Sequence, residues 1–114
     1  MHIKRNQMTV EDKEKLRGGE GTARFTHLVP AETLGRAKLF SEIRLPPGAA
    51  IGYHRHDGET EYYVFVSGTG VVNDNGDECT VVPGDVTVTG SGCSHSLANN
   101  GNEDLVLHAL IIFD

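Results

Sequence analysis

Turns rich in glycine divide most of this chain into segments that are too short for long helices. The chain has 114 residues, of which 14 are glycine, and turn signals recur about every ten residues beyond position 21. The segments between the turns either alternate apolar and polar residues or are rich in β-branched and aromatic residues, which are preferences of β-strands. We expect strands at 23–29, 36–45, 62–66, 71–72, 79–85, 85–90 and 104–113. This pattern is typical of an all-β sandwich or barrel.

The first twenty residues differ from the rest of the chain. We expect an N-terminal arm over 1–20, followed by a single β-domain over 21–114, because the length suits one domain. Within the arm, the stretch TVEDKEKLRGG (9–19) has a capping residue at its start, acidic residues in its first turn and a pair of glycines at its end. These signals predict one short N-terminal helix at most.

Charge and hydropathy exclude several classes of partner. The chain carries 10 basic against 16 acidic residues, a formal net charge of −6, and it has no basic stripe, which argues against nucleic acid. No apolar run reaches the roughly 18 residues that a membrane span needs. The polar start lacks the apolar core of a secretory signal, so we expect a cytoplasmic protein. Cys79 and Cys93 are then expected to be free, buried thiols.

The stretch YHRHDGETEYY (53–63) concentrates side chains that bind metals. His54 and His56 are two residues apart, so on a strand they point to the same face. Glu61 begins the next expected strand, and an antiparallel return would bring it to the same space. If His95, from a later strand–turn–strand stretch, faces that interior too, the set is three imidazoles and one carboxylate. This set suits a divalent transition metal.

A polar surface turn is the alternative interpretation of this stretch. Asp57 and Glu59 fit that interpretation best, and we expect them to be solvated turn residues. His2, His27 and His108 have no partner at ligand spacing, so we expect them to lie outside a metal site.

Two spaced motifs resemble those of the cupin superfamily. The first consists of Gly48, five residues, His54-x-His56, four residues, Glu61, six residues and Gly68. The second consists of Gly84, five residues, Gly90-x-Gly92, two residues, His95, three residues and Asn99. The family usually has proline where this chain has Gly90, a change that loosens a turn but removes no ligand.

The resemblance implies a cupin-type jelly-roll β-barrel of two antiparallel sheets. It assigns the four ligand roles to His54, His56, Glu61 and His95, with one divalent transition metal (Mn, Fe, Zn or Ni) as the cofactor. The chain looks most like small stand-alone cupins that are grouped with oxalate-decarboxylase-like and sugar-isomerase-like proteins. Asn99 is expected to be structural.

Two classes of function fit these features, and we favour the first over the second. The first is a metalloenzyme that decarboxylates, oxygenates or isomerises a small oxygen-rich substrate, a carboxylate or a sugar-like molecule. The second is a module that binds a small molecule through its metal without turnover. Tyr63, in phase with Glu61, is the candidate for a catalytic residue, although a core aromatic is the alternative. Arg44 and Lys38 are candidates for binding an anionic substrate, although surface charge is the alternative.

The apolar content also predicts self-association. The stretch LVLHALIIF (105–113) and the outer face of YYVFV (62–66) provide more apolar surface than one small barrel needs. We therefore expect a homodimer that buries the excess and protects strand edges.

Overall fold

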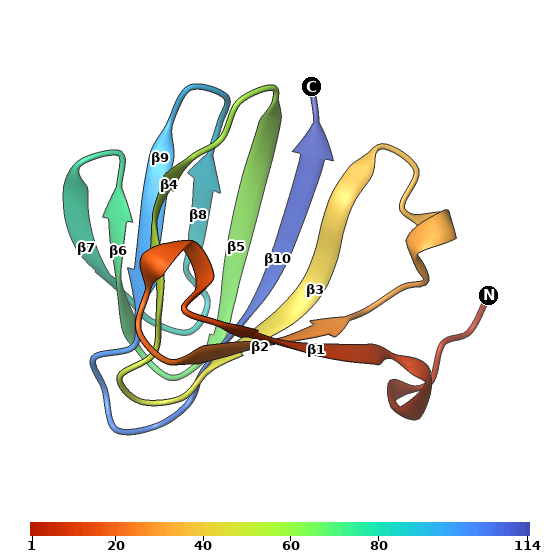
Figure 1. Ribbon diagram of the computed structural model, residues 1–114, viewed down its shortest axis with the longest axis horizontal. Helices are drawn as coiled ribbons and strands as arrows, with labels where there is room; N and C mark the ends of the chain where they lie inside the picture. Colours follow the sequence, from red (N-terminus) through yellow and green to blue (C-terminus); the bar gives the residue numbers. More distant parts are fainter.

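The computed structural model describes residues 1–114 and consists of two antiparallel β-sheets that face one another (Figure 1). The larger sheet has six strands in the order β1 (Thr9–Glu14), β2 (Thr22–His27), β3 (Ala37–Leu45), β10 (Leu105–Phe113), β5 (Glu59–Ser67) and β8 (Val86–Thr89). The smaller sheet has four strands in the order β4 (Ala50–Arg55), β9 (Ser94–Ala98), β6 (Gly70–Asp74) and β7 (Asp77–Val81). The expected all-β jelly roll is confirmed.

Short helical turns complete the structure. They are the 3-10 turns η1 (Arg5–Gln7), η2 (Leu16–Gly18) and η3 (Ala31–Thr33). None of these helical segments has the length and apolar character needed to span a membrane.

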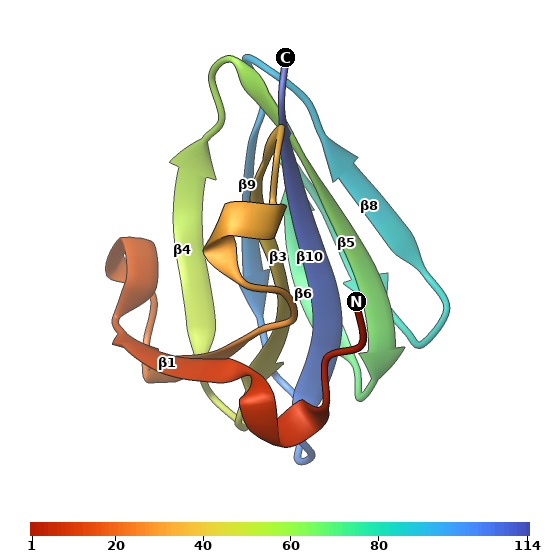
Figure 2. The same ribbon diagram turned by 90° about the vertical axis from the view of Figure 1, so that its right-hand side faces the viewer.

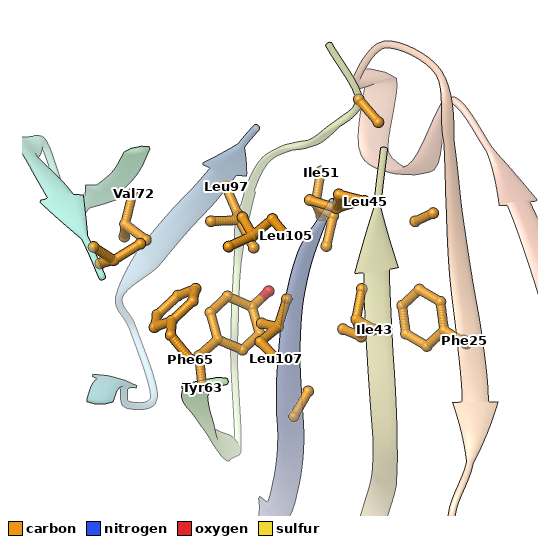
Figure 3. Close-up of a cluster of buried hydrophobic side chains, with 14 residues drawn as sticks. Phe25, Ile43, Leu45, Ile51, Tyr63, Phe65, Val72, Leu97, Leu105 and Leu107 are labelled. Atoms are coloured by element: carbon orange, nitrogen blue, oxygen red, sulfur yellow. The ribbon is translucent and has the colours of Figure 1, made fainter. Parts of the chain in front are cut away.

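Alternation along the strands builds the core. In β3, Ile43 and Leu45 are buried and Arg44 between them is exposed. A cluster of 14 buried apolar residues fills the space between the sheets. Figure 3 shows Tyr63 and Leu107 of the larger sheet in this cluster together with Leu97 of the smaller one. The central strands, such as β3, therefore give one face to the interior between the sheets, where the site also lies.

The arm contains no α-helix, which agrees with the expectation of at most one short helix, but the stretch 9–19 that carried the helix signals folds differently. Residues Thr9–Glu14 form β1, which pairs with β2 at the edge of the larger sheet. The pair is joined by a bidentate contact in which Arg24 donates to Asp12 at 2.9 and 3.1 Å. Backbone pairing with β2 and this cross-strand contact outweigh the local helix signals, which are weak in a segment so poor in apolar residues.

Two glycines let the arm approach the smaller sheet closely. A Cβ atom at Gly19 would lie 2.1 Å from the carbonyl oxygen of Ala50, and one at Gly52 would lie 2.0 Å from that of Arg17. The amide of Ala50 also donates to the carbonyl of Glu20 at 2.8 Å. The turn η2 is thus held against β4, beside which it lies in Figure 2.

The cysteines differ from expectation in their burial. Both are free, but Cys79 is exposed on β7 and Cys93 is partly exposed. β7 is the edge strand of the smaller sheet and contains one buried residue, Val81. The strand expected to run to position 85 ends there, because the Pro83–Gly84 turn follows.

Candidate metal centre

Four side chains from three strands and one loop converge between the sheets. They are His54 on β4, His56 just beyond its end, Glu61 on β5 and His95 on β9. One potential ligand atom from each lies within 4.8 Å of all the others. His54 and His95 are direct cross-strand partners, and the amide of His56 donates to the carbonyl of Cys93 at 2.9 Å. The structure therefore brings together all four residues expected to hold a metal.

Each imidazole is oriented by a contact at its outer nitrogen. Nδ1 of His54 donates to the carbonyl of Gly52 at 2.7 Å. Nδ1 of His56 donates to Oε2 of Glu59 at 2.5 Å, and Nδ1 of His95 lies 2.9 Å from the hydroxyl of Thr89. With the outer nitrogens engaged, the Nε2 atoms are the ones free to face the centre.

The inward atoms lie so close together that they call for a cation. Nε2 of His56 lies 3.0 Å from Nε2 of His95. Both nitrogens also approach the same oxygen of Glu61, at 3.1 and 3.0 Å. Imidazoles protonated at Nδ1 direct lone pairs at one another and at a carboxylate, which is unfavourable unless a positive ion or a proton lies between them. Three imidazole nitrogens and one carboxylate oxygen fit a divalent transition metal.

The pKa values of these groups reflect their burial and mutual contacts. The hydrogen bond to Glu61 raises the pKa of His56 above its usual value. Burial acts to raise the pKa of Glu61, but the hydrogen bonds from His56 and His95 outweigh it and the net shift is downward. Burial lowers the pKa of His54, and the nearby charges of the other imidazoles and of Arg17 act in the same direction. Glu61 is therefore ionised, as a ligand must be.

Glu59 is part of the site, and its assignment to a solvated turn is wrong. Its side chain is buried, with the residue 7% exposed. One oxygen accepts the hydrogen bond from His56, and the other accepts one from Nζ of Lys38 at 3.0 Å. Burial acts to raise the pKa of Glu59, but these two contacts lower it overall. Asp57, by contrast, is exposed and pairs with Arg55, as expected for a turn residue.

The two cations proposed for substrate binding lie in different places. In the pairing of β3 with β10, Leu39 is opposite Ile111 and Ala37 is opposite Ile112, so Lys38 has no partner. This bulge turns the side chain of Lys38 toward the interior cavity, which it lines. Arg44 lies outside that cavity and pairs with Asp104 at 3.1 Å. Of the two candidates, Lys38 therefore lies at the cavity beside the cluster and Arg44 lies away from it.

Tyr63 lies beside the candidate metal ligands. Its ring stacks on that of His95, with centroids 4.9 Å apart and planes 17° apart. Burial, followed by the charge of Glu61 and a hydrogen bond to it, raises the pKa of Tyr63 well above its usual value. The hydroxyl therefore keeps its proton. Tyr63 also lines the cavity, so it combines the two roles considered from the sequence, core aromatic and cavity residue.

A cavity of about 260 Å³ lies against the four-residue cluster. Its apolar wall comes from both sheets and from η2, and consists of Leu16, Phe25, Leu39, Ile43, Ile51 and Ile111. Apart from His54, His56 and Glu61, its polar lining consists of Lys13, Arg17, Lys38, Glu59 and Tyr63. A space of this size suits a small molecule with a few polar groups.

Sequence reasoning missed several residues of this lining. Counting back in twos from Glu61 places Glu59 on the same face of β5, so the strand phase could have identified it. Lys13 and Arg17 gave no such signal, because the arm reaches the cavity only through the pairing of β1 with β2 and the contact with β4.

Comparisons with known proteins agree with this architecture. The model of the Cupin_2 family, described as a cupin domain, matches residues 41–113. A protein of Thermotoga maritima named "Oxalate-binding protein" is 42% identical over 113 residues, which cover 98% of this chain and 93% of that protein. A crystal structure from Thermotoga maritima, described as a predicted oxalate decarboxylase, matches with a TM-score of 0.94 and 41% identity over 100% of both chains. A structure from Acidithiobacillus ferrooxidans, described as a putative sugar phosphate isomerase, matches with a TM-score of 0.73 and 27% identity, covering 80% of this chain and 59% of that one.

Proposed function

The chain belongs to the family of cupin domains, and from that premise we propose that it binds a small dicarboxylate, of which oxalate is the simplest, at a divalent metal. The metal is held by His54, His56, Glu61 and His95. The observation that carries the proposal is the convergence of these four donors, within 4.8 Å of one another, beside a small cavity.

The donor set leaves room for such a ligand. A bound octahedral ion with four protein ligands would offer about two further positions to a chelating acid. The apolar wall of the cavity would exclude water from the bound acid, and the cationic lining would favour an anion. The name of the Thermotoga maritima relative supports oxalate for this role.

The identity of the bound metal determines which reactions the site could support. Imidazole and carboxylate ligands accept Mn, Fe, Zn and Ni, and we propose that one of these is the resident ion. Oxidative reactions need Mn or Fe, whereas isomerisation tolerates Zn.

Turnover of the bound acid is the second candidate function. The solved relative described as a predicted oxalate decarboxylase favours it, as does the Tyr63 hydroxyl in the cavity wall. Binding without turnover is favoured by the state of the proton-carrying groups, because Glu59 is paired with Lys38 and His56. The buried hydroxyl of Tyr63, whose pKa is raised, also holds its proton. Decarboxylation, dioxygenation and isomerisation therefore rank behind binding.

Calorimetry with sodium oxalate tests the proposal. We expect manganese-loaded protein to bind oxalate with a stoichiometry of about one per chain, and metal-free protein and the His95→Ala variant not to bind it. The same samples are then assayed for release of carbon dioxide. Loss of bound oxalate with release of gas would establish turnover. Oxalate binding that is equal with and without metal would refute the proposal.

We also propose that the protein is a homodimer, formed through the outer face of β5 and β8. Exposed apolar side chains lie next to one another there, since Tyr62 pairs with Val88 and Val64 pairs with Val86. Val66 extends the same face. A two-fold contact between two copies would bury the patch on both.

Elution volume and light scattering test the dimer. We expect Val64→Asp to shift the protein to a monomer at micromolar concentration, since it buries a charge in the contact. Val10→Asp is the matched control, because Val10 is exposed on β1, outside this face. A parent protein that elutes as a monomer would refute the dimer.

A further inference from the structure

Two of the three cationic side chains that line the cavity have no acidic partner. Lys38 is paired with Glu59 at 3.0 Å. Lys13 and Arg17 line the same cavity, and neither forms an ion pair with any carboxylate of the chain. Four other arginines do form such pairs, namely Arg5, Arg24, Arg44 and Arg55. Lys4, Lys15 and Arg36 also form no ion pair but lie outside this cavity. The gathering of two unpaired cations at one cavity is what indicates an anionic ligand.

Lys13 is held at the cavity by an aromatic ring. Its Nζ lies 4.3 Å from the centroid of Phe25, a buried residue that also lines the cavity. A cation over an aromatic face is attracted by the negative charge of the ring face. The ammonium group is therefore positioned on the wall of the cavity and keeps donors for a ligand.

Arg17 is held at the cavity by its backbone. Lys15 and Arg17 both adopt positive φ angles, of 49° and 55°, which are unfavourable for residues with a side chain. The carbonyl of Arg17 packs against Gly52, where any Cβ would collide with it. Gly52 in turn is two residues before His54 and accepts its Nδ1 hydrogen bond. The strained turn thus places Arg17 beside a metal ligand, and strain of this kind is frequent at functional sites.

The charges of the centre fit a dianion. Glu61 is the one carboxylate among the four ligands, so a divalent ion would remain net positive. An acid that chelates this ion would still present outward oxygen atoms to the cavity. A guanidinium offers paired donors to a carboxylate, and an ammonium adds a point charge.

We infer that Lys13 and Arg17 are the groups that recognise the anion, contacting the outward carboxylate oxygens of a metal-bound dianion. The N-terminal arm is then part of the binding site, and it selects small dicarboxylates over monocarboxylates and neutral sugars. This inference rests on the proposed function and adds the residues that set its specificity.

Titration of manganese-loaded, full-length protein with sodium oxalate and with sodium acetate tests the inference. The variants are Arg17→Gln, Lys13→Gln and Arg17→Lys, with manganese content measured for each. Lys15→Gln is the matched control, because Lys15 is in the same strained turn and is exposed, as Arg17 is, but does not line the cavity. We expect Arg17→Gln and Lys13→Gln to weaken oxalate binding by about tenfold or more, with manganese content unchanged. Arg17→Lys retains part of the oxalate affinity that Arg17→Gln loses. The preference for oxalate over acetate falls in both glutamine variants. Lys15→Gln binds within about twofold of the parent, as expected of a surface charge that does not contact the ligand.

The other outcomes distinguish failure of the recognition role of Lys13 and Arg17 from failure of the proposed function. If the parent binds oxalate and both glutamine variants bind it equally well, the recognition role is wrong and the proposed function stands. An equal loss in Lys15→Gln would mean that overall charge, and not contact, attracts the anion, which overturns the inference. Loss of manganese from the glutamine variants would assign the arm to metal retention instead. Failure of the manganese-loaded parent to bind oxalate overturns the proposed function and this inference together.

Discussion

The carboxylate of Glu59 accepts a hydrogen bond from Nδ1 of His56 at 2.5 Å. The contact fixes the tautomer of His56, so that its Nε2 presents a lone pair to the other ligands. It also makes that nitrogen more basic, and therefore a better ligand. Lys38 holds the second oxygen of Glu59. A bulge on β3 and a buried acid on β5 therefore orient one candidate metal ligand, His56, which lies just beyond the end of β4.

Replacing Glu59 should weaken metal binding without removing a ligand. We expect Glu59→Gln to lower the metal affinity by about tenfold or more, because contacts of this kind orient a ligand and tune its basicity. Competition with a chelator measures the affinity. Asp57→Asn is the control, since Asp57 is exposed and pairs with Arg55 outside the cavity. Equal affinity in Glu59→Gln and the parent would show that the contact has no role in the site.

Metal affinity should fall as the pH falls, and the fall should begin above pH 6.5. The pKa of His56 is raised from its ordinary value of 6.5, chiefly by its hydrogen bond to Glu61. Because the pKa is raised, a proton occupies His56 at a higher pH than usual and competes with the metal. Glu61, whose pKa is lowered, stays ionised over this range. Competition with a chelator between about pH 8 and about pH 6 measures whether the metal affinity falls as the pH falls. An affinity that is constant or rises over that interval would contradict it.

The turn between β5 and β6 should tolerate no side chain at Gly68. Its φ is +79°, and a Cβ there would lie 2.3 Å from the carbonyl oxygen of Asp104. Gly35 also has a positive φ, of +59°, but has open space around the Cβ position. We expect Gly35→Ala to lower the free energy of unfolding by about 1–2 kcal/mol, from backbone strain alone. Gly68→Ala should cost more, about 3 kcal/mol or above, because the clash with backbone must also be relieved. Urea unfolding measures both, and equal losses would rule out the clash.

Local patterns predicted the parts of the fold in which each strand has one buried face. The alternation of Ile43, Arg44 and Leu45 was sufficient to orient β3. The arm was predicted wrongly because its structure depends on a distant partner. β1 exists through pairing with β2 and the contact between Asp12 and Arg24, whereas the sequence signals near Thr9 favoured a helix.

The site was predictable where the ligands follow a fixed spacing. His54, His56, Glu61 and His95 were selected as candidate ligands from this spacing, and the structure brings them together. The residues around them depend on features that spacing does not reveal. Lys38 reaches the cavity through a bulge. Arg17 reaches it through the close approach of the arm to β4, and Arg44, on the regular part of the same strand as Lys38, points away.

Elemental analysis of tag-free protein that has never met a chelator tests the central claim most directly. The parent is compared with the His54→Ala/His56→Ala double variant and with His2→Ala, an exposed histidine outside the cluster. We predict about one divalent transition-metal ion per chain in the parent and in His2→Ala, and none in the double variant. Equal metal in all three proteins, or none in the parent even after reconstitution with Mn, Fe, Zn and Ni, would contradict the metal centre.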